Sequence, residues 1–383
     1  MEGARCNCRV QGECTDSAST PVTAQCPPAH QQDGLFSRRA LLVASAGLGL
    51  TIGAMPERLE AAGLAAQQAK EGNNMAQGVP LPSWNEGASK QAILDFVAAV
   101  TEEGGEQFVP EDARIATFDN DGTLWTEQPM YAQAFFILDQ IKTLAPQHPE
   151  WQTEQPYAAV LAGDREAMAK FSEADLGKLV AAAHSGMTTT EFDEQARAWA
   201  ESAVNPLTKH RFIDSVYQPQ LELLDYLRAN GFRVFIVSGG GVDLMRVFSQ
   251  DVYGVSPDMV VGSSGKVKFA LEDGIPTLTK LPELDSYDDK DGKPVNIHLH
   301  IGQKPILAFG NSDGDQAMLE YVTSGDGPSL GLIIHHDDAA REVAYDRDSR
   351  VGKLDTALAA APDWGWIVVS MKDDWGKVFP FEE

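Results

Sequence analysis

Two acidic residues separated by a single position follow a short apolar run. The stretch reads IATFDNDGTLWT, which places Asp119 and Asp121 directly after the run and Gly122 next to them. Crowded carboxylates can ligate a cation, attack an electrophilic centre or exchange a proton. Asp and Gly are also ordinary turn residues, so this stretch alone does not distinguish a reactive site from a turn.

Two further apolar runs end in residues of similar chemical interest. FIVSGGG carries Ser238 followed by Gly239 and Gly240, and LAFGNSDGD carries Asn311 and Asp315. A hydroxyl beside bare backbone N–H groups is a usual cradle for phosphate oxygens. Ligands of parallel α/β sheets bind at the carboxyl ends of the strands, so three such endings predict one shared site.

The elements that would position these residues alternate along the chain. Strands are expected at RIATF, FRVFIVSGGG, KPILAFGNSDGD and SLGLIIHH, with weaker strand-like stretches at DMVVGSS and KVKFAL. Helical patterns lie between them, which predicts an α/β fold with a doubly wound, Rossmann-like parallel sheet covered on both faces. A helical block after the first strand predicts an inserted, mostly helical cap domain.

Together these motifs resemble the haloacid dehalogenase (HAD) superfamily, and within it the phosphatases with a helical cap of the C1 type, such as phosphoserine phosphatases. The resemblance runs from about residue 113 to 335. It implies that Asp119 is a nucleophile that forms an aspartyl phosphate and that Asp121 is the general acid/base. Dehalogenases of the superfamily lack the second acid, so Asp121 favours a phosphatase.

The resemblance also implies how a phosphate would be held. Ser238, Gly239 and Gly240 would bind it, and Lys293 in DGKP would neutralise the nucleophile. Lys290 is the rival for this role, but the proline after Lys293 suits a first helical turn.

The cofactor implied by the resemblance is Mg²⁺, a hard ion that prefers oxygen ligands. Its expected ligands are the Asp119 side chain, the Asp121 backbone carbonyl and the motif that contains Asn311 and Asp315. Asn311 stands where the family usually has Asp, and an amide oxygen can ligate but brings no charge. Asn311, Asp313 and Asp315 therefore remain alternatives for direct ligation.

The expected function is magnesium-dependent hydrolysis of a small phosphomonoester. Glu127 lies close in sequence to where phosphoserine phosphatases use a Glu to read the substrate amine, so an amine-bearing substrate is one candidate. Two alternatives are a phosphotransferase or phosphomutase of the same fold, and a non-catalytic phosphate-binding protein.

The charge of the chain restricts its partners. The sequence holds 30 Lys and Arg against 56 Asp and Glu, for a formal charge of −26. Such a surface does not attract nucleic acid or an anionic membrane. The expected partner is a small phosphorylated metabolite, for which a metal, a lysine or backbone N–H groups must supply local positive charge.

The N-terminal region resembles an export signal. Arg38 and Arg39 precede an apolar segment at 40–55, as in signals read by the twin-arginine export machinery. The expected location is periplasmic or otherwise exported, and cytoplasmic if the leader is not functional. The four cysteines, Cys6, Cys8, Cys14 and Cys26, all precede this segment, so a processed chain would have no disulfide.

The chain is expected to divide into four parts. Residues 1–66 are a disordered leader with the signal, and 67–127 are a linker with the first strand. Residues 128–212 are the helical cap, and 213–383 are the rest of the core with the tail.

Overall fold

The computed structural model of the chain describes residues 79–382. The expected leader, its arginine pair and the four cysteines lie outside these residues. No helix within 79–382 is long and apolar enough to cross a membrane.

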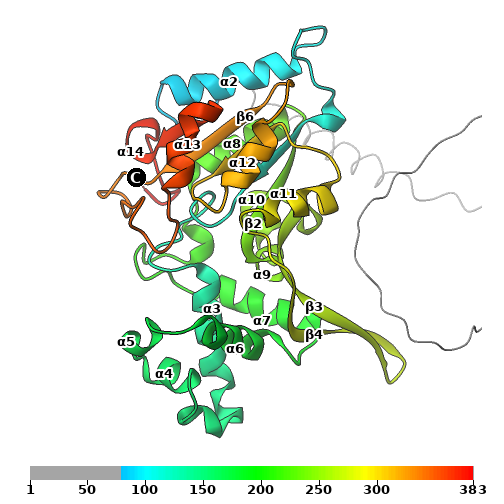
Figure 1. The fold of residues 1–383 in the computed structure, drawn as a ribbon, viewed down its shortest axis with the longest axis vertical. Helices are drawn as coiled ribbons and strands as arrows, with labels where there is room; N and C mark the ends of the chain where they lie inside the picture. The colour runs from blue at the N-terminus through cyan, green and yellow to red at the C-terminus, as the bar shows by residue number, and fades with distance from the viewer. Residues whose placement is uncertain (1–78, 383) are drawn as a thin grey trace, which may run out of the picture. The chain divides into compact units, whose positions relative to one another are not determined.

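A seven-stranded sheet organises the described part of the chain (Figure 1). Its order is β4-β3-β2-β1-β5-β6-β7, and every neighbouring pair is parallel except β3 with β4. The strands are β1 Ile115–Phe118, β2 Arg233–Gly241, β3 Val260–Glu272, β4 Ile275–Ser286, β5 Leu307–Gly310, β6 Leu330–His335 and β7 Ile367–Ser370. The predicted α/β class with a mostly parallel sheet is confirmed.

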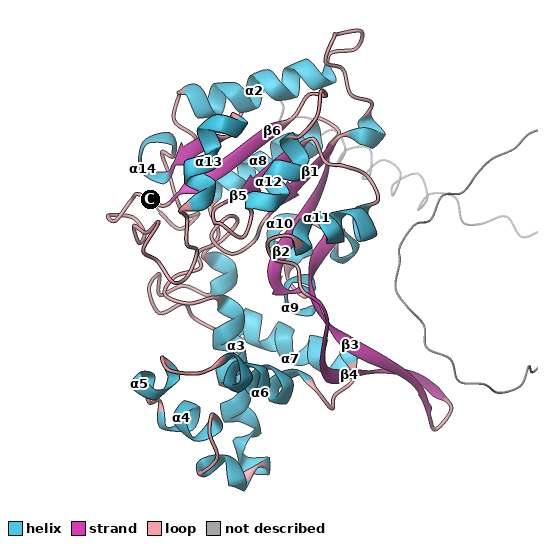
Figure 2. Cartoon of the chain, in the orientation of Figure 1, coloured by secondary structure: helices cyan, strands magenta, loops and turns pink. Residues whose placement is uncertain are grey.

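Helices cover both faces of this sheet (Figure 2). Alternate residues of one strand face opposite sides: Ile236 belongs to the apolar cluster that holds α2, α8 and α10, and Val237 to the cluster that holds α12 and α13. The helices of the core are α2 Ala88–Thr101, α8 Gln218–Ala229, α9 Val242–Arg246, α10 Ser249–Tyr253, α11 Gly292–Asn296, α12 Gln316–Thr323, α13 Thr356–Trp364 and α14 Met371–Asp374. Short turns of 3-10 helix occur at Glu111–Ala113, Ala145–Gln147, Pro149–Gln152, Phe212–Asp214 and Pro257–Met259, and a π-helical turn at Ile297–Ile301.

A helical insert separates β1 from α8. Its helices are α3 Ala132–Leu144, α4 Tyr157–Ala162, α5 Arg165–Met168, α6 Glu173–His184 and α7 Thr189–Ser202. The helices α3 to α6 share an apolar cluster of their own that includes Ile141 and Leu179, whereas Phe192 and Trp199 of α7 belong to the main core cluster. Ser172 and Thr188 start α6 and α7 with capping boxes, which satisfy N–H groups that the first helical turn leaves free.

An antiparallel hairpin extends from the edge of the sheet beside α7 (Figure 1). We call the ladder of β3 and β4 from Gly265 to Leu284 the hairpin arm. Its inner part pairs with the helical insert, because Lys280 N–H donates to Met187 O and Gly186 N–H donates to Lys280 O. The two strand-like stretches expected at DMVVGSS and KVKFAL are therefore one strand, and its partner β4 was not expected from the sequence.

Candidate active site

Three strand ends and one helix meet at a single cavity. Asp119 follows β1, Ser238 lies near the end of β2, Asp315 follows β5, and Lys293 lies in α11. All four line a cavity of about 650 Å³. Asp121, Glu127, Gly239 and Gly240 line the same cavity, so eight of the nine residues expected at the site share it. The ninth, Asn311, contacts the cavity wall through Glu127.

Lys293 holds two acids together. Its Nζ donates to Asp119 Oδ1 at 2.7 Å, to Asp315 Oδ1 at 2.5 Å and to Val237 O at 2.9 Å. Burial alone would lower the pKa of Lys293, but the Asp119 and Asp315 carboxylates outweigh it and hold the pKa above its ordinary value. The ammonium is therefore charged at every physiological pH. Lys290, the rival lysine, lies exposed at a backbone φ of +51° and does not line the cavity.

The two acids of the first motif lie in different environments. Asp119 is 6% exposed; burial raises its pKa well above the ordinary value and Asp315 adds to this, whereas Lys293 opposes it. Asp121 Oδ1 accepts the Trp125 Nε1–H at 2.8 Å. Burial raises the pKa of Asp121 to about 6, so this carboxyl group can exchange a proton near neutral pH.

The Gly-rich end of β2 bulges out of the sheet. The register with β3 shifts between Ser238 and Gly241, so Gly239 and Gly240 leave the ladder and face the cavity. Gly240 N–H donates to Ser238 Oγ at 3.2 Å, and Ser263 Oγ donates to Gly239 O at 2.9 Å. A Cβ on Gly240 would lie 3.4 Å from Asp121 Oδ2, which places the carboxyl group of Asp121 beside this loop.

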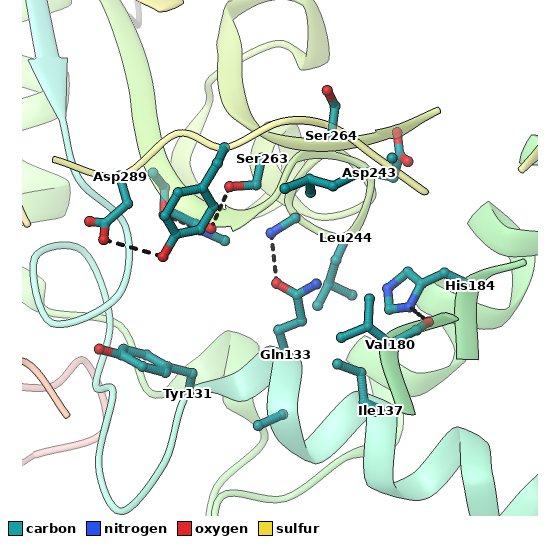
Figure 3. Close-up of a pocket in the computed structure, with 18 of the residues that line it drawn as sticks. Tyr131, Gln133, Ile137, Val180, His184, Asp243, Leu244, Ser263, Ser264 and Asp289 are labelled. Carbon is teal, nitrogen blue, oxygen red and sulfur yellow. Dashed lines mark hydrogen bonds between the residues drawn. The ribbon is translucent and has the colours of Figure 1, made fainter. Parts of the chain in front are cut away.

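The helical insert contributes directly to the loop. Gln133 of α3 accepts the Gly241 N–H through Oε1 at 2.7 Å. In Figure 3, Tyr131, Gln133 and Ile137 lie on one side of the cavity, and Ser263, Ser264 and Asp289 lie on the other. Gln133 lies in a helix with no motif around it, so this contact was not predictable from the sequence.

The three residues that remained alternatives for the metal have separate surroundings. Asp315 Oδ2 accepts the N–H groups of Asn311 and Ser312, both at 3.0 Å, and its Oδ1 faces Lys293. Asp313 Oδ1 instead accepts N–H groups at the start of α13 and does not line the cavity. The Asn311 amide makes a hydrogen bond at each end. Its Oδ1 accepts from Thr123 Oγ1 at 3.2 Å, and its Nδ2 donates to Glu127 Oε1 at 2.7 Å.

Glu127 is buried and held by distant parts of the chain. It is 1% exposed, and its Oε1 also accepts from Tyr345 OH at 2.7 Å. Burial raises the pKa of Glu127 well above its ordinary value, and Asp121 and Asp119 add to this. Tyr345 had no sequence signal, since it stands alone in a loop more than two hundred residues away.

His336 supports the turn after Asp121. Its Nε2 lies 2.8 Å from Gly122 O, and a carbonyl can only accept, so this ring nitrogen donates. The ring also stacks on Tyr345 at a centroid distance of 4.4 Å. His336, directly after β6, therefore positions the loop of the first motif.

The rest of the cavity is mainly apolar. Ile137, Val180, Phe192 and Leu244 come from the helices α3, α6, α7 and α9 around it. One ion pair interrupts this wall, in which the buried Lys280 ammonium of β4 bonds the Asp243 carboxylate.

The family model of haloacid dehalogenase-like hydrolases matches residues 116–320. This span contains every residue that lines the cavity; Tyr345 and His336, which contact the site from behind, lie outside it. The chain belongs to the haloacid dehalogenase-like hydrolase family. The superfamily that the motifs resembled is thereby confirmed.

Solved structures of low sequence identity are similar to this haloacid dehalogenase-like hydrolase. A protein of unknown function from Bordetella pertussis is 14% identical over 67% of this chain and 97% of its own, with a TM-score of 0.42. A phosphoserine phosphohydrolase-like protein from Francisella tularensis is 17% identical over 58% of this chain and 87% of its own, with a TM-score of 0.32. A probable phosphoserine phosphatase from Vibrio cholerae is 15% identical over 66% of this chain and 68% of its own, with a TM-score of 0.32. No curated protein matches the chain.

The cavity of this haloacid dehalogenase-like hydrolase offers oxygen donors to a hard cation. Each of three carboxylates makes its side-chain hydrogen bonds within the described residues through one oxygen, which leaves Asp119 Oδ2, Asp121 Oδ2 and Glu127 Oε2. Residues 79–382 hold no group of three or more His, Cys, Asp or Glu arranged as a complete metal site. Few carboxylates, supplemented by backbone and amide oxygens and by water, are the usual donors for Mg²⁺, so the residues present fit this ion.

Proposed function

We propose that the chain is a magnesium-dependent phosphomonoesterase that works through an aspartyl phosphate on Asp119. One relationship carries the proposal: Asp119 presents one carboxylate oxygen to Lys293 while the other is free in a cavity that also holds Ser238 and Asp121. A nucleophile, a phosphate cradle and a proton donor thus share one chamber, as phosphoryl transfer to an enzyme carboxylate requires.

The first step uses both acids of the first motif. Asp119 Oδ2 attacks phosphorus, the bond from phosphorus to the ester oxygen breaks, and Asp121 gives its proton to the leaving oxygen. In the second step Asp121 takes a proton from water, the water oxygen attacks phosphorus, and the bond to Asp119 breaks to release phosphate. Asp121 must change protonation state between the steps, which agrees with its pKa of about 6.

The negative charge of the phosphoryl group is balanced from several directions. Ser238 Oγ accepts the Gly240 N–H and keeps its own proton for a phosphate oxygen, and Lys293 neutralises Asp119. Asp119, Asn311 and the backbone of Asp121 would hold Mg²⁺, which when bound offsets charge on the nucleophile and the transferred group.

The leaving group would face the helical insert. Apolar side chains such as Ile137, Val180 and Phe192 dominate that side of the cavity, which favours a phosphomonoester with an apolar or aromatic body. Glu127 was expected to read a substrate amine; its Oε1 accepts two hydrogen bonds from the protein, which leaves Oε2 for any ligand.

Hydrolysis of p-nitrophenyl phosphate tests the proposal. The purified chain with Mg²⁺ should release phosphate, and Asp119→Asn should reduce the rate by about 10³-fold or more while circular dichroism and Tm stay unchanged. Asp95→Asn removes an equal charge from the exposed side of α2 and should retain full activity. An Asp119→Asn protein as active as the original would refute the mechanism.

The same assay separates the two alternatives. A phosphate-binding protein would retain inorganic phosphate without turnover. A phosphotransferase would pass the phosphoryl group to added alcohols or sugars faster than it releases phosphate.

A further inference from the structure

We propose that Glu127 is a carboxylate of the cation site and supplies the negative charge that Asn311 lacks. The inference rests on the proposed function only in requiring a divalent cation beside Asp119. It assigns Glu127 to the cation and not to the substrate.

The first observation is the contact between the two side chains. Asn311 Nδ2 donates to Glu127 Oε1 at 2.7 Å across a sequence separation of 184 residues. An aspartate at position 311 would bring two carboxylates into direct contact, which is unfavourable in a buried site. One of the two positions can therefore hold the charge and the other the amide, and in this chain the charge is at residue 127.

The second observation is the space kept for this carboxylate. A Cβ on Gly122 would lie 2.5 Å from Glu127 Oε1, and a Cβ on Gly352 would lie 1.7 Å from it. Both glycines have left-handed φ angles, +76° and +64°, which side chains rarely adopt. Two segments far apart in sequence thus leave room for the Glu127 head group, and Tyr345 OH donates to it.

The third observation is the free oxygen. Both hydrogen bonds that the described residues make to this carboxylate go to Oε1, so Oε2 is left without a partner in a side chain that is only 1% exposed. Glu127 lines the same cavity as Asp119 and Asp121. A carboxylate oxygen that accepts no hydrogen bond and belongs to a side chain in the cavity wall is available to a bound cation.

The other acids of the third motif cannot fill this role. Asp315 directs one oxygen to Lys293 and the other to two backbone N–H groups, and Asp313 faces the start of α13. Glu127 keeps Oε2 free of hydrogen bonds from the described residues, and its head group lies beside Gly122 of the first motif.

Binding of Mn²⁺ to the metal-free full-length chain, measured by titration calorimetry without substrate, tests the inference. Glu127→Gln should weaken Mn²⁺ binding by about 10- to 100-fold, the range for lost support at a metal site. The double variant Glu127→Gln/Asn311→Asp moves the charge back to position 311 and keeps an amide opposite a carboxylate. It should recover affinity to within about threefold of the original chain.

A matched control separates this role from a purely structural network. Tyr345→Phe removes a hydrogen bond to Glu127 but keeps the carboxylate, so it should lower Tm and leave Mn²⁺ affinity within about threefold. Unchanged Mn²⁺ binding by Glu127→Gln, or a double variant as weak as Glu127→Gln, would overturn the inference. An original chain that binds no Mn²⁺ would overturn it as well.

Failure of the proposed function has a different signature. If the original chain binds Mn²⁺ and follows the expected order of variants but hydrolyses no phosphomonoester, the phosphatase proposal fails and the assignment of Glu127 stands.

Discussion

Lys293 Nζ lies 2.7 Å from Asp119 Oδ1 although 174 positions separate the two residues in the sequence. The same ammonium lies 2.5 Å from Asp315 Oδ1. One lysine on α11 therefore joins the ends of β1 and β5, and the two acids depend on it for their charge balance.

Lys293→Met should destabilise the chain and remove activity. The substitution leaves two buried carboxylates without a counter-charge, a defect that costs about 3–5 kcal/mol. Urea unfolding at pH 7 in the metal-free state measures it. Lys290→Met removes an exposed lysine three positions earlier and should change neither stability nor turnover; equal effects of the two substitutions would contradict the assignment.

Asp121→Asn should separate the two chemical steps. p-Nitrophenolate leaves without a proton, so a rapid burst of about one equivalent should remain, followed by steady-state turnover reduced about 10²- to 10⁴-fold because no base activates water. Phenyl phosphate, whose leaving oxygen needs the proton, should show no burst. Stopped-flow absorbance distinguishes these cases, and full steady-state turnover by the variant would show that Asp121 is not the acid/base.

Asp121 should also make stability depend on pH. Its pKa is raised to about 6 in the folded chain, against an ordinary value near 4, so its stabilising contribution is complete below pH 4 and is lost as the pH rises through 6. In metal-free protein, Asp121→Asn should therefore gain stability relative to the original chain by about 1–3 kcal/mol between pH 4 and pH 8. A difference that stays constant over this range would exclude the raised pKa.

Ser238→Ala should weaken phosphate binding. Loss of a hydroxyl that donates to an anionic oxygen costs about 1.5–3 kcal/mol, or roughly a 10- to 100-fold rise in the inhibition constant of inorganic phosphate. Ser264→Ala, on β3 in the wall of the same cavity, is the control and should leave inhibition unchanged. Identical inhibition constants for the two variants would place the phosphate elsewhere.

Much of the core was predictable because the strands of a covered parallel sheet are continuous apolar runs. IATF of β1 and LAFG of β5 are buried throughout, and turn residues follow each of them. The hairpin arm has no such run. Lys, Thr, Pro and Glu interrupt β4, and its conformation depends on pairing with β3 and with the helical insert.

The site was predictable where chemistry is local and not where it depends on distant contacts. Asp119, Asp121 and Ser238 are recognisable from the strand ends that precede or contain them. Glu127 is only eight residues after Asp119, but its surroundings come from Asn311 and Tyr345, which no local pattern connects to it. Asp313 and Asp315 likewise look alike in the sequence. The turn after β5 directs Asp313 to the start of α13 and Asp315 to Lys293.

One strand, β3, forms a side of the hairpin arm and also contacts the phosphate cradle at the end of β2. In the outer half of β3, Phe269 and Leu271 are 62% and 66% exposed. In the inner half, Ser263 Oγ donates to the carbonyl of Gly239. A molecule that binds the exposed end of β3 would therefore contact the strand that holds the Gly-rich loop in place, without entering the chamber where Asp119 lies.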